Sequence, residues 1–98
     1  MDLNTSLTKE QARYALWLED KAPYLLPLFD FDQQSYRPDK VEKYLGVASH
    51  GQAIMARFFL GVWRHQDQFD FDFVDAAGTL DKQQMTVIID WLQHPLWP

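Results

Sequence analysis

The chain has 98 residues, which is the size of one domain. Hydrophobic residues make up 47% and charged residues 23% of the sequence, a composition typical of a folded globular protein. The net charge of −5 argues against a surface that follows nucleic-acid phosphates, and the absence of cysteine excludes disulfides, thiolate nucleophiles and cysteine zinc sites. We expect a single cytoplasmic domain over residues 1–98, because no stretch is apolar enough for a membrane span or a signal peptide.

Helix starts are the strongest local signals. At four places where an apolar periodicity begins, a Ser, Thr or Asp is followed three residues later by Glu or Gln, the spacing of a reciprocal capping box. These pairs are Thr8 with Gln11, Asp39 with Glu42, Ser49 with Gln52, and Asp81 with Gln84. The predicted helices cover residues 9–21, 40–45, 50–65 and 82–93. Gly46 is expected to end the second of them in a left-handed conformation.

The apolar stretch at 24–29 is interrupted by Pro27, which predicts a connector that packs on the core, with room for a single helical turn. The sequence Phe-Asp-Phe-Asp then occurs twice, at 29–32 and at 69–72. Strict alternation is typical of a strand, so the two copies could pair as a short β-ribbon.

The second copy is ambiguous, because the residues after it favour a helix. A short helix at 73–77, capped by Asp70 or Asp72 and ended by Gly78, is the preferred interpretation.

The helix at 50–65 is expected to form the centre of the core. From Ala53 to Trp63 its only charged residue is Arg57, and a helix that is apolar nearly all round is typically buried. Gly61 is predicted to mark a close helix crossing, and Arg57 to pair with an aspartate or, as a second choice, to bind an anionic group. The predicted fold is therefore all-α, a compact bundle of four to five short helices around this one.

No arrangement typical of catalysis, cofactor binding or metal binding is present. The histidines at 50, 65 and 94 lack metal-ligand spacing, and the serines and glycines form neither a nucleophile elbow nor a phosphate-binding loop. The sequence therefore predicts no catalytic, cofactor-binding or metal-ligating residues. An enzyme remains a less favoured alternative, which predicts a cleft where a histidine meets a carboxylate.

Residues 41–61 have the outline of a helix-turn-helix, with Leu-Gly-Val at the turn. Its second helix, however, would present mainly apolar side chains to DNA, with only Gln52, Arg57 and Arg64 able to reach a base or phosphate. Together with the negative net charge, this argues against direct nucleic-acid binding.

Aromatic residues make up 15% of the chain, including four tryptophans, more than a small core readily buries. Tryptophan and arginine commonly anchor protein interfaces, so we expect Trp17, Trp97 and Arg57 to contact a partner. This predicts a small non-catalytic interaction or adaptor module with a protein partner, and it allows a homodimer. This hypothesis fails if all four tryptophans (17, 63, 91 and 97) are buried and no apolar patch remains exposed.

The acidic residues are unevenly distributed. Between Arg64 and Lys82 there are five aspartates and no lysine or arginine. They either cap helices on a solvated surface or form a binding face, so the alternative function is an acidic inhibitor of a nucleic-acid-handling protein. The aspartates assigned to such a face are Asp67, Asp70, Asp72 and Asp75.

Overall fold

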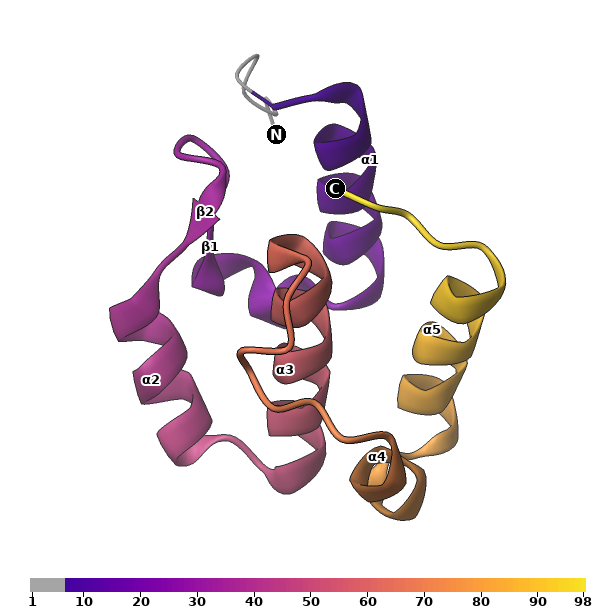
Figure 1. Ribbon diagram of the computed structural model, residues 1–98. Coiled ribbons are helices and arrows are strands. Elements are labelled where there is room, and N and C mark those ends of the chain that lie inside the picture. Colours follow the sequence, from indigo (N-terminus) through magenta and orange to yellow (C-terminus); the bar gives the residue numbers. More distant parts are fainter. Residues whose placement is uncertain (1–6) are drawn as a thin grey trace.

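The computed structural model describes residues 7–98, which form an all-α bundle with one short antiparallel ribbon (Figure 1). Residues 1–6 lie outside the described part of the chain, so the expectation about a signal peptide stays a prediction. In chain order the elements are α1 (Lys9–Lys21), the 3-10 helix η1 (Pro23–Leu28), β1 (Phe29–Asp30), β2 (Ser35–Tyr36), α2 (Pro38–Val47), α3 (His50–Arg64), α4 (Phe73–Thr79) and α5 (Lys82–Gln93).

Capping boxes set the starts of α1, α3 and α5, as predicted. Thr8, Ser49 and Asp81 each accept a hydrogen bond from the backbone N–H three residues on. The glutamine at that position in turn accepts one from the N–H of the cap residue. Because each side-chain cap contributes about 1 kcal/mol, these three helices begin where the sequence places them.

The fourth predicted capping box, Asp39 with Glu42, does not form. α2 instead begins at Pro38, and its N-cap Arg37 makes no side-chain capping bond. Proline's fixed φ and missing N–H suit the first helical turn, so the helix starts earlier than predicted.

The prediction that glycines end two of the helices is wrong. Gly46 lies inside α2 and Gly78 inside α4, and no glycine of the described residues has a positive φ. Both helices end instead in an extended residue, Ala48 after α2 and Leu80 after α4. A left-handed glycine is one way to leave a helix, and an extended residue is another that any side chain permits.

A β-ribbon is present, but the two Phe-Asp-Phe-Asp copies do not pair with each other. Phe29 pairs with Tyr36 and Asp30 with Ser35, so the first copy folds back on the residues that follow it. The second copy is not a strand, and Asp72 caps α4 by accepting hydrogen bonds from the N–H groups of residues 74 and 75. The preferred helical interpretation of residues 73–77 is therefore confirmed.

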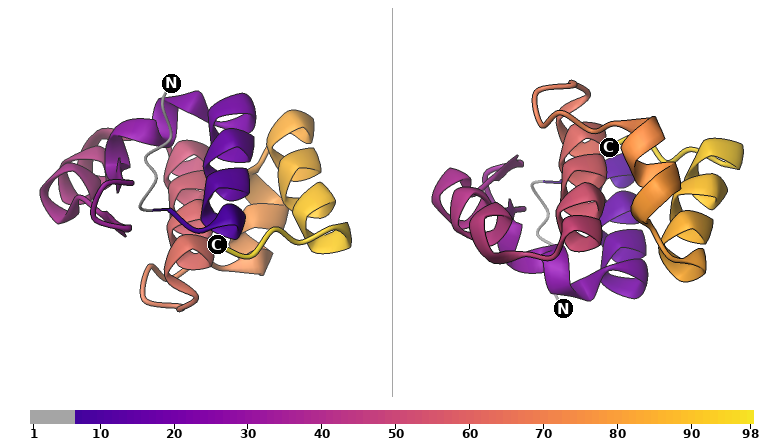
Figure 2. Two further views of the ribbon diagram at one scale, coloured as in Figure 1. Left: turned by 90° about the horizontal axis from the view of Figure 1, so that it is seen from above. Right: turned by 90° about the horizontal axis from the view of Figure 1, so that it is seen from below.

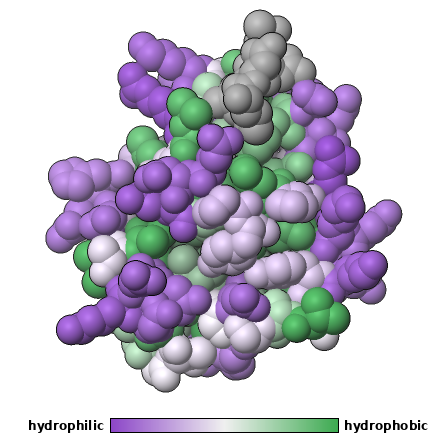
Figure 3. Space-filling view, turned by 180° about the vertical axis from the view of Figure 1, so that it is seen from behind, coloured by the Kyte–Doolittle hydropathy of each residue, from purple (hydrophilic) through white to green (hydrophobic). Residues whose placement is uncertain are grey.

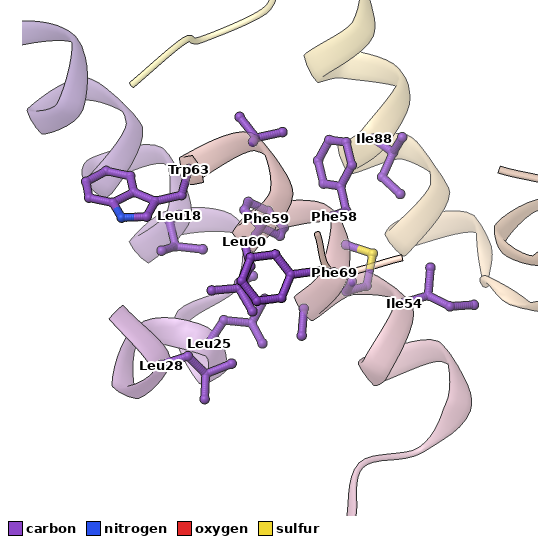
Figure 4. Packing of buried hydrophobic residues seen from close by; sticks show 14 of the residues in the cluster. Leu18, Leu25, Leu28, Ile54, Phe58, Phe59, Leu60, Trp63, Phe69 and Ile88 are labelled. Atoms are coloured by element: carbon purple, nitrogen blue, oxygen red, sulfur yellow. The ribbon is translucent and has the colours of Figure 1, made fainter. Parts of the chain in front are cut away.

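α3 occupies the centre of the bundle, as predicted. It lies between α2 on one side and α4 and α5 on the other (Figure 2), and eight of its fifteen residues are buried. Side chains from α1, η1, α5 and the segment 65–72 converge on it (Figure 4), and they include Leu18, Leu25, Phe69 and Ile88. Burying one large apolar side chain contributes about 1.5–3 kcal/mol, so α3 organises most of the stabilising contacts.

Two polar groups within this aromatic core donate hydrogen bonds to backbone carbonyls. The Tyr14 hydroxyl donates a 2.8 Å hydrogen bond to the carbonyl of Phe59, and burial raises the pKa of Tyr14 well above its usual value. The Trp63 indole donates at 3.0 Å to the carbonyl of Ser35, which joins α3 to β2.

Gly61 does not mark a helix crossing. A Cβ at this position would lie 3.2 Å from the carbonyl oxygen of Gln66, and the Gln66 N–H donates to the Gly61 carbonyl at 3.1 Å. His65 between them is left-handed, with φ 55°. The glycine therefore lets the chain fold back tightly over the end of α3, which places the segment 65–72 across that helix (Figure 1).

On the face opposite to that of Figure 1, hydrophilic residues follow both sides and less polar residues lie between them (Figure 3). The helices within residues 7–98 are all too short or too polar to cross a bilayer.

The large apolar side chains exposed in this part of the chain are Leu16, Tyr24, Val47, Phe73, Val74, Ile89, Leu92 and Trp97. Most of them lie apart along the chain, but Phe73 and Trp97 border the same groove.

Candidate functional site

A groove of about 530 Å³ opens beside the carboxyl-terminal half of α3. Three parts of the chain form it: the end of α3, the segment that folds back over it as far as the start of α4, and the tail after α5. The residues that line it are Arg57, Phe58, Gly61, Val62, His65, Gln66, Asp67, Phe69, Phe71, Phe73 and Trp97. Most of these side chains are apolar, and the site depends on the sharp reversal after Gly61.

A continuous run of aromatic rings borders the groove, and its members come from α3, the segment 65–72, α4, α5 and the tail after α5. Phe73 packs on Phe71 with ring centroids 4.9 Å apart, and Phe71 packs on Phe58 at 5.4 Å. Phe58 packs on Trp91 at 5.5 Å, and Trp91 on Trp97 at 4.9 Å. Three of these contacts are edge-to-face, and the contact between Phe58 and Phe71 is tilted. Aromatic pairs of this kind add about 0.5–1.5 kcal/mol each beyond burial, so these rings form a rigid wall.

Two members of this wall remain largely open to solvent at its ends. Phe73 is 59% exposed and Trp97 is 54% exposed. Trp97 also lies against His65, with ring centroids 5.3 Å apart, so the tail is held against the end of α3. Large aromatic side chains that are packed on one side and exposed on the other provide contact area at little conformational cost.

Arg57 does not form the predicted ion pair with an aspartate. Its Nη1 instead donates a 2.7 Å hydrogen bond to the backbone carbonyl of Phe69, and no carboxylate of residues 7–98 lies within salt-bridge distance. The cation therefore holds the segment 65–72 against α3, because it satisfies a carbonyl that the irregular backbone leaves without a partner.

A smaller hollow of about 380 Å³ adjoins the groove and shares Arg57 and Phe71 with it. Within it, His50 Nε2 lies 2.8 Å and 3.0 Å from the two carboxylate oxygens of Asp75. The Thr79 hydroxyl also donates to Asp75, at 3.3 Å. This pair joins the start of α3 to α4, and it places a histidine against a carboxylate, as the enzyme alternative expects.

The acidic residues of the candidate face differ in how they are used. Asp72 caps α4, and Asp75 binds His50 and Thr79. The side chains of Asp67 and Asp70 are exposed and make no hydrogen bond or ion pair with other described residues. Asp67 lines the groove, and Asp70 lines the hollow with Asp72 and Asp75. The fifth aspartate of the segment, Asp81, caps α5.

The structure brings together most, but not all, of the residues predicted to bind a partner. Trp97, Arg57 and Asp67 line the groove, with the other three aspartates beside it. Trp17 is half-buried at a different place, against Phe59 with ring centroids 5.1 Å apart. Trp63 and Trp91 are buried, whereas Trp97 is more than half exposed, so the four tryptophans are not all buried.

Sequence reasoning missed the aromatic groove residues other than Trp97. From the sequence, Phe58 is expected only as part of the buried helix at 50–65, and the pattern around Phe71 and Phe73 indicates only secondary structure. The one available signal was the density of phenylalanine after His65, because alternation with aspartate keeps one side of such a segment apolar.

The described residues contain no group of three or more histidine, aspartate or glutamate side chains able to hold a metal ion. The helix-turn-helix outline corresponds to α2 and α3, which are joined by residues 48 and 49. A recognition helix needs an exposed face, whereas α3 is the central core helix. Its Arg57 binds a backbone carbonyl, and its Arg64 lies over the Tyr36 ring, with 5.5 Å to the ring centroid.

Comparison of the chain with protein-family models, with curated proteins and with solved structures found no match.

Proposed function

We propose that this protein is a non-catalytic interaction module that binds a protein partner through the aromatic groove. The observation that carries the proposal is the position of Phe73 and Trp97, which border one groove while more than half exposed. Both rings lie outside the buried core: Phe73 packs on the partly buried Phe71, and Trp97 packs on the buried Trp91. A partner that covered both rings would bury two aromatic anchors at the centre of its interface.

The proposal is tested by affinity capture from a lysate of the source organism, with and without nuclease. Wild-type protein is compared with Phe73→Ala and Trp97→Ala, and Val74→Ala is the matched control. Val74 neighbours Phe73 and is 84% exposed, but it does not line the groove.

A stoichiometric partner should be retained by the wild type and by Val74→Ala and lost by both groove variants. Interface anchors of this type cost about 2 kcal/mol or more when truncated, which is roughly a thirtyfold loss of affinity. Equal retention by all four proteins, or no partner at all, would reject the groove as a binding site.

The acidic-inhibitor alternative is favoured by one observation, the two carboxylates of Asp67 and Asp70 that have no partner among the described residues. It predicts capture of a nucleic-acid-handling protein that nucleic acid displaces. The same experiment distinguishes this alternative, because nuclease treatment would then increase the capture.

A further inference from the structure

We infer the chemical class of the segment that occupies the groove: a peptide with a large apolar anchor flanked by lysine or arginine. This inference rests on the proposed function and makes it more specific. It follows from two features that lie side by side, an apolar groove and an adjoining row of carboxylates.

The apolar anchor follows from the composition of the groove. Its volume of about 530 Å³ is within the range of pockets that hold drug-sized ligands, so it has room for one or two large side chains. The cation next to its apolar wall, Arg57, already donates to the carbonyl of Phe69. An occupant therefore gains most from apolar contact with Phe58, Val62 and Phe71.

The basic flanks follow from charge. From residue 65 to residue 81 the chain carries five aspartates and no lysine or arginine. Asp67 lies at the groove and Asp70 in the adjoining hollow, and neither carboxylate is paired with another described residue. The basic side chains nearest in the chain have other contacts: Arg64 lies over the Tyr36 ring, and the His65 ring lies against Trp97.

The same charges disfavour other occupants. A second copy of this chain would bring another net charge of −5 and an equally acidic segment to the interface. An anionic membrane surface or a nucleic acid would be repelled by the same carboxylates. A basic peptide is attracted, and its complementary charge would also speed association at low ionic strength.

The test selects peptides from a random library displayed on phage against the folded protein. The enriched peptides are synthesised, and their Kd values are measured by calorimetry at low and high salt. The variants are Asp67→Asn, Asp70→Asn and Trp97→Ala, with Glu42→Gln on α2 as a control that removes one negative charge far from the groove in sequence. Asp70 has φ 60°, a conformation that asparagine tolerates as well as aspartate, so this variant should keep the backbone.

We expect enriched peptides to combine an apolar anchor with lysine or arginine and to bind more weakly as salt increases. Each Asp→Asn change should weaken binding about two- to fivefold, as for exposed ion pairs, and Glu42→Gln should not change it. Trp97→Ala should weaken binding roughly thirtyfold.

The other outcomes separate the two proposals. Apolar peptides without basic residues that still require Trp97 would overturn this inference and leave the interaction function standing. Peptides that bind Trp97→Ala as well as the wild type, or no enrichment at all, would overturn both. If sedimentation shows a dimer and peptides compete with dimer formation, the occupant of the groove is a second copy of this chain, and the inference of a basic peptide is overturned.

Discussion

The same four residues, Phe-Asp-Phe-Asp, occur at 29–32 and at 69–72 and fold in two different ways. The first copy begins in β1, and the second is irregular and ends as the cap of α4. Their first phenylalanines nevertheless have matching environments. Phe29 and Phe69 are both buried, and each carbonyl accepts a hydrogen bond from an arginine, Arg37 at 3.2 Å and Arg57 at 2.7 Å.

The residues downstream explain the difference in backbone. After the first copy, Gln34 adopts φ 53° and the chain turns back to pair as β2. After the second copy comes an alanine-containing stretch that forms a helix, and Asp72 caps it. The comparison teaches that alternation determines which side chains are buried, while the following residues determine the backbone that buries them.

The two copies also differ in what they leave exposed. Phe31 stacks on Phe29 at 5.8 Å and lies edge-on to Trp63. Phe71 instead lies between Phe58 and Phe73 and faces the groove. The first copy completes the core, and the second provides one wall of the candidate site.

The largest effect is expected from removing the first phenylalanine of each copy. It tests whether these residues stabilise the fold through burial rather than through strand pairing. Phe29→Ala and Phe69→Ala should each lower the free energy of unfolding by about 3–5 kcal/mol, since both rings are almost fully buried. Urea denaturation followed by tryptophan fluorescence measures the change. Val47→Ala, at a site that is 80% exposed, should stay within about 0.5 kcal/mol of the wild type. A near-neutral result at Phe69 would show that the second copy is not anchored as described.

The hydrogen bonds from Arg57 and Arg37 should contribute different amounts to the free energy of unfolding. Arg57→Met leaves the Phe69 carbonyl without its partner in a partly buried place, and we expect a loss of about 1–3 kcal/mol in the free energy of unfolding. Arg37→Met should cost less, about 1 kcal/mol, because that side chain is 47% exposed and its 3.9 Å ion pair with Asp30 is weak. Thermal unfolding of both variants in parallel checks the order, and a reversed order would contradict it.

The helix cap at the end of the second copy is expected to contribute less to the free energy of unfolding than Arg57 does. Asp72→Ala removes the acceptor for two N–H groups of α4 and should lower the free energy of unfolding by about 1 kcal/mol. Asp72→Ser keeps a capping oxygen and should recover most of this loss. If the two variants are equally destabilised, the aspartate acts through its charge rather than as a cap.

The smallest effect concerns the second residue of each copy. Asp70→Gly should change the free energy of unfolding by less than about 1 kcal/mol, because glycine adopts φ 60° freely and this offsets its greater entropy when unfolded. Asp30→Gly places glycine in β1 and removes the acceptor of the Gln33 N–H, so it should be clearly destabilising. Equal effects at the two sites would mean that the two backbones differ less than described.

The sequence predicts the bounds of a helix correctly where a local interaction determines where the helix begins or ends. The bounds of α1 and α5 were predicted correctly because a capping box opens each helix, and Pro23 and Pro95 follow their ends. It does not predict the end of a helix where several backbone conformations can end it. At Gly46 a left-handed glycine is expected, but the extended residue Ala48 ends the helix instead.

The groove itself could not be predicted, because it depends on contacts between distant residues. Phe58, Phe71 and Trp97 lie far apart in the chain and line one groove. The reversal after Gly61 brings Phe71 there, and contacts with His65 and Trp91 hold Trp97 there. The partner of Arg57 was missed for a related reason: it is a backbone carbonyl, which no residue pattern reveals.

The most direct test uses the indole N–H signals of the tryptophans in a two-dimensional NMR titration with the tightest-binding library peptide. Trp97 borders the groove, whereas the Trp63 indole is fixed by its 3.0 Å hydrogen bond to Ser35 beside the first copy. If the second copy forms the binding site, the Trp97 signal should shift in proportion to occupancy and the Trp63 signal should stay in place. A shift of Trp63 with an unchanged Trp97 would contradict the assignment of the groove as the binding site.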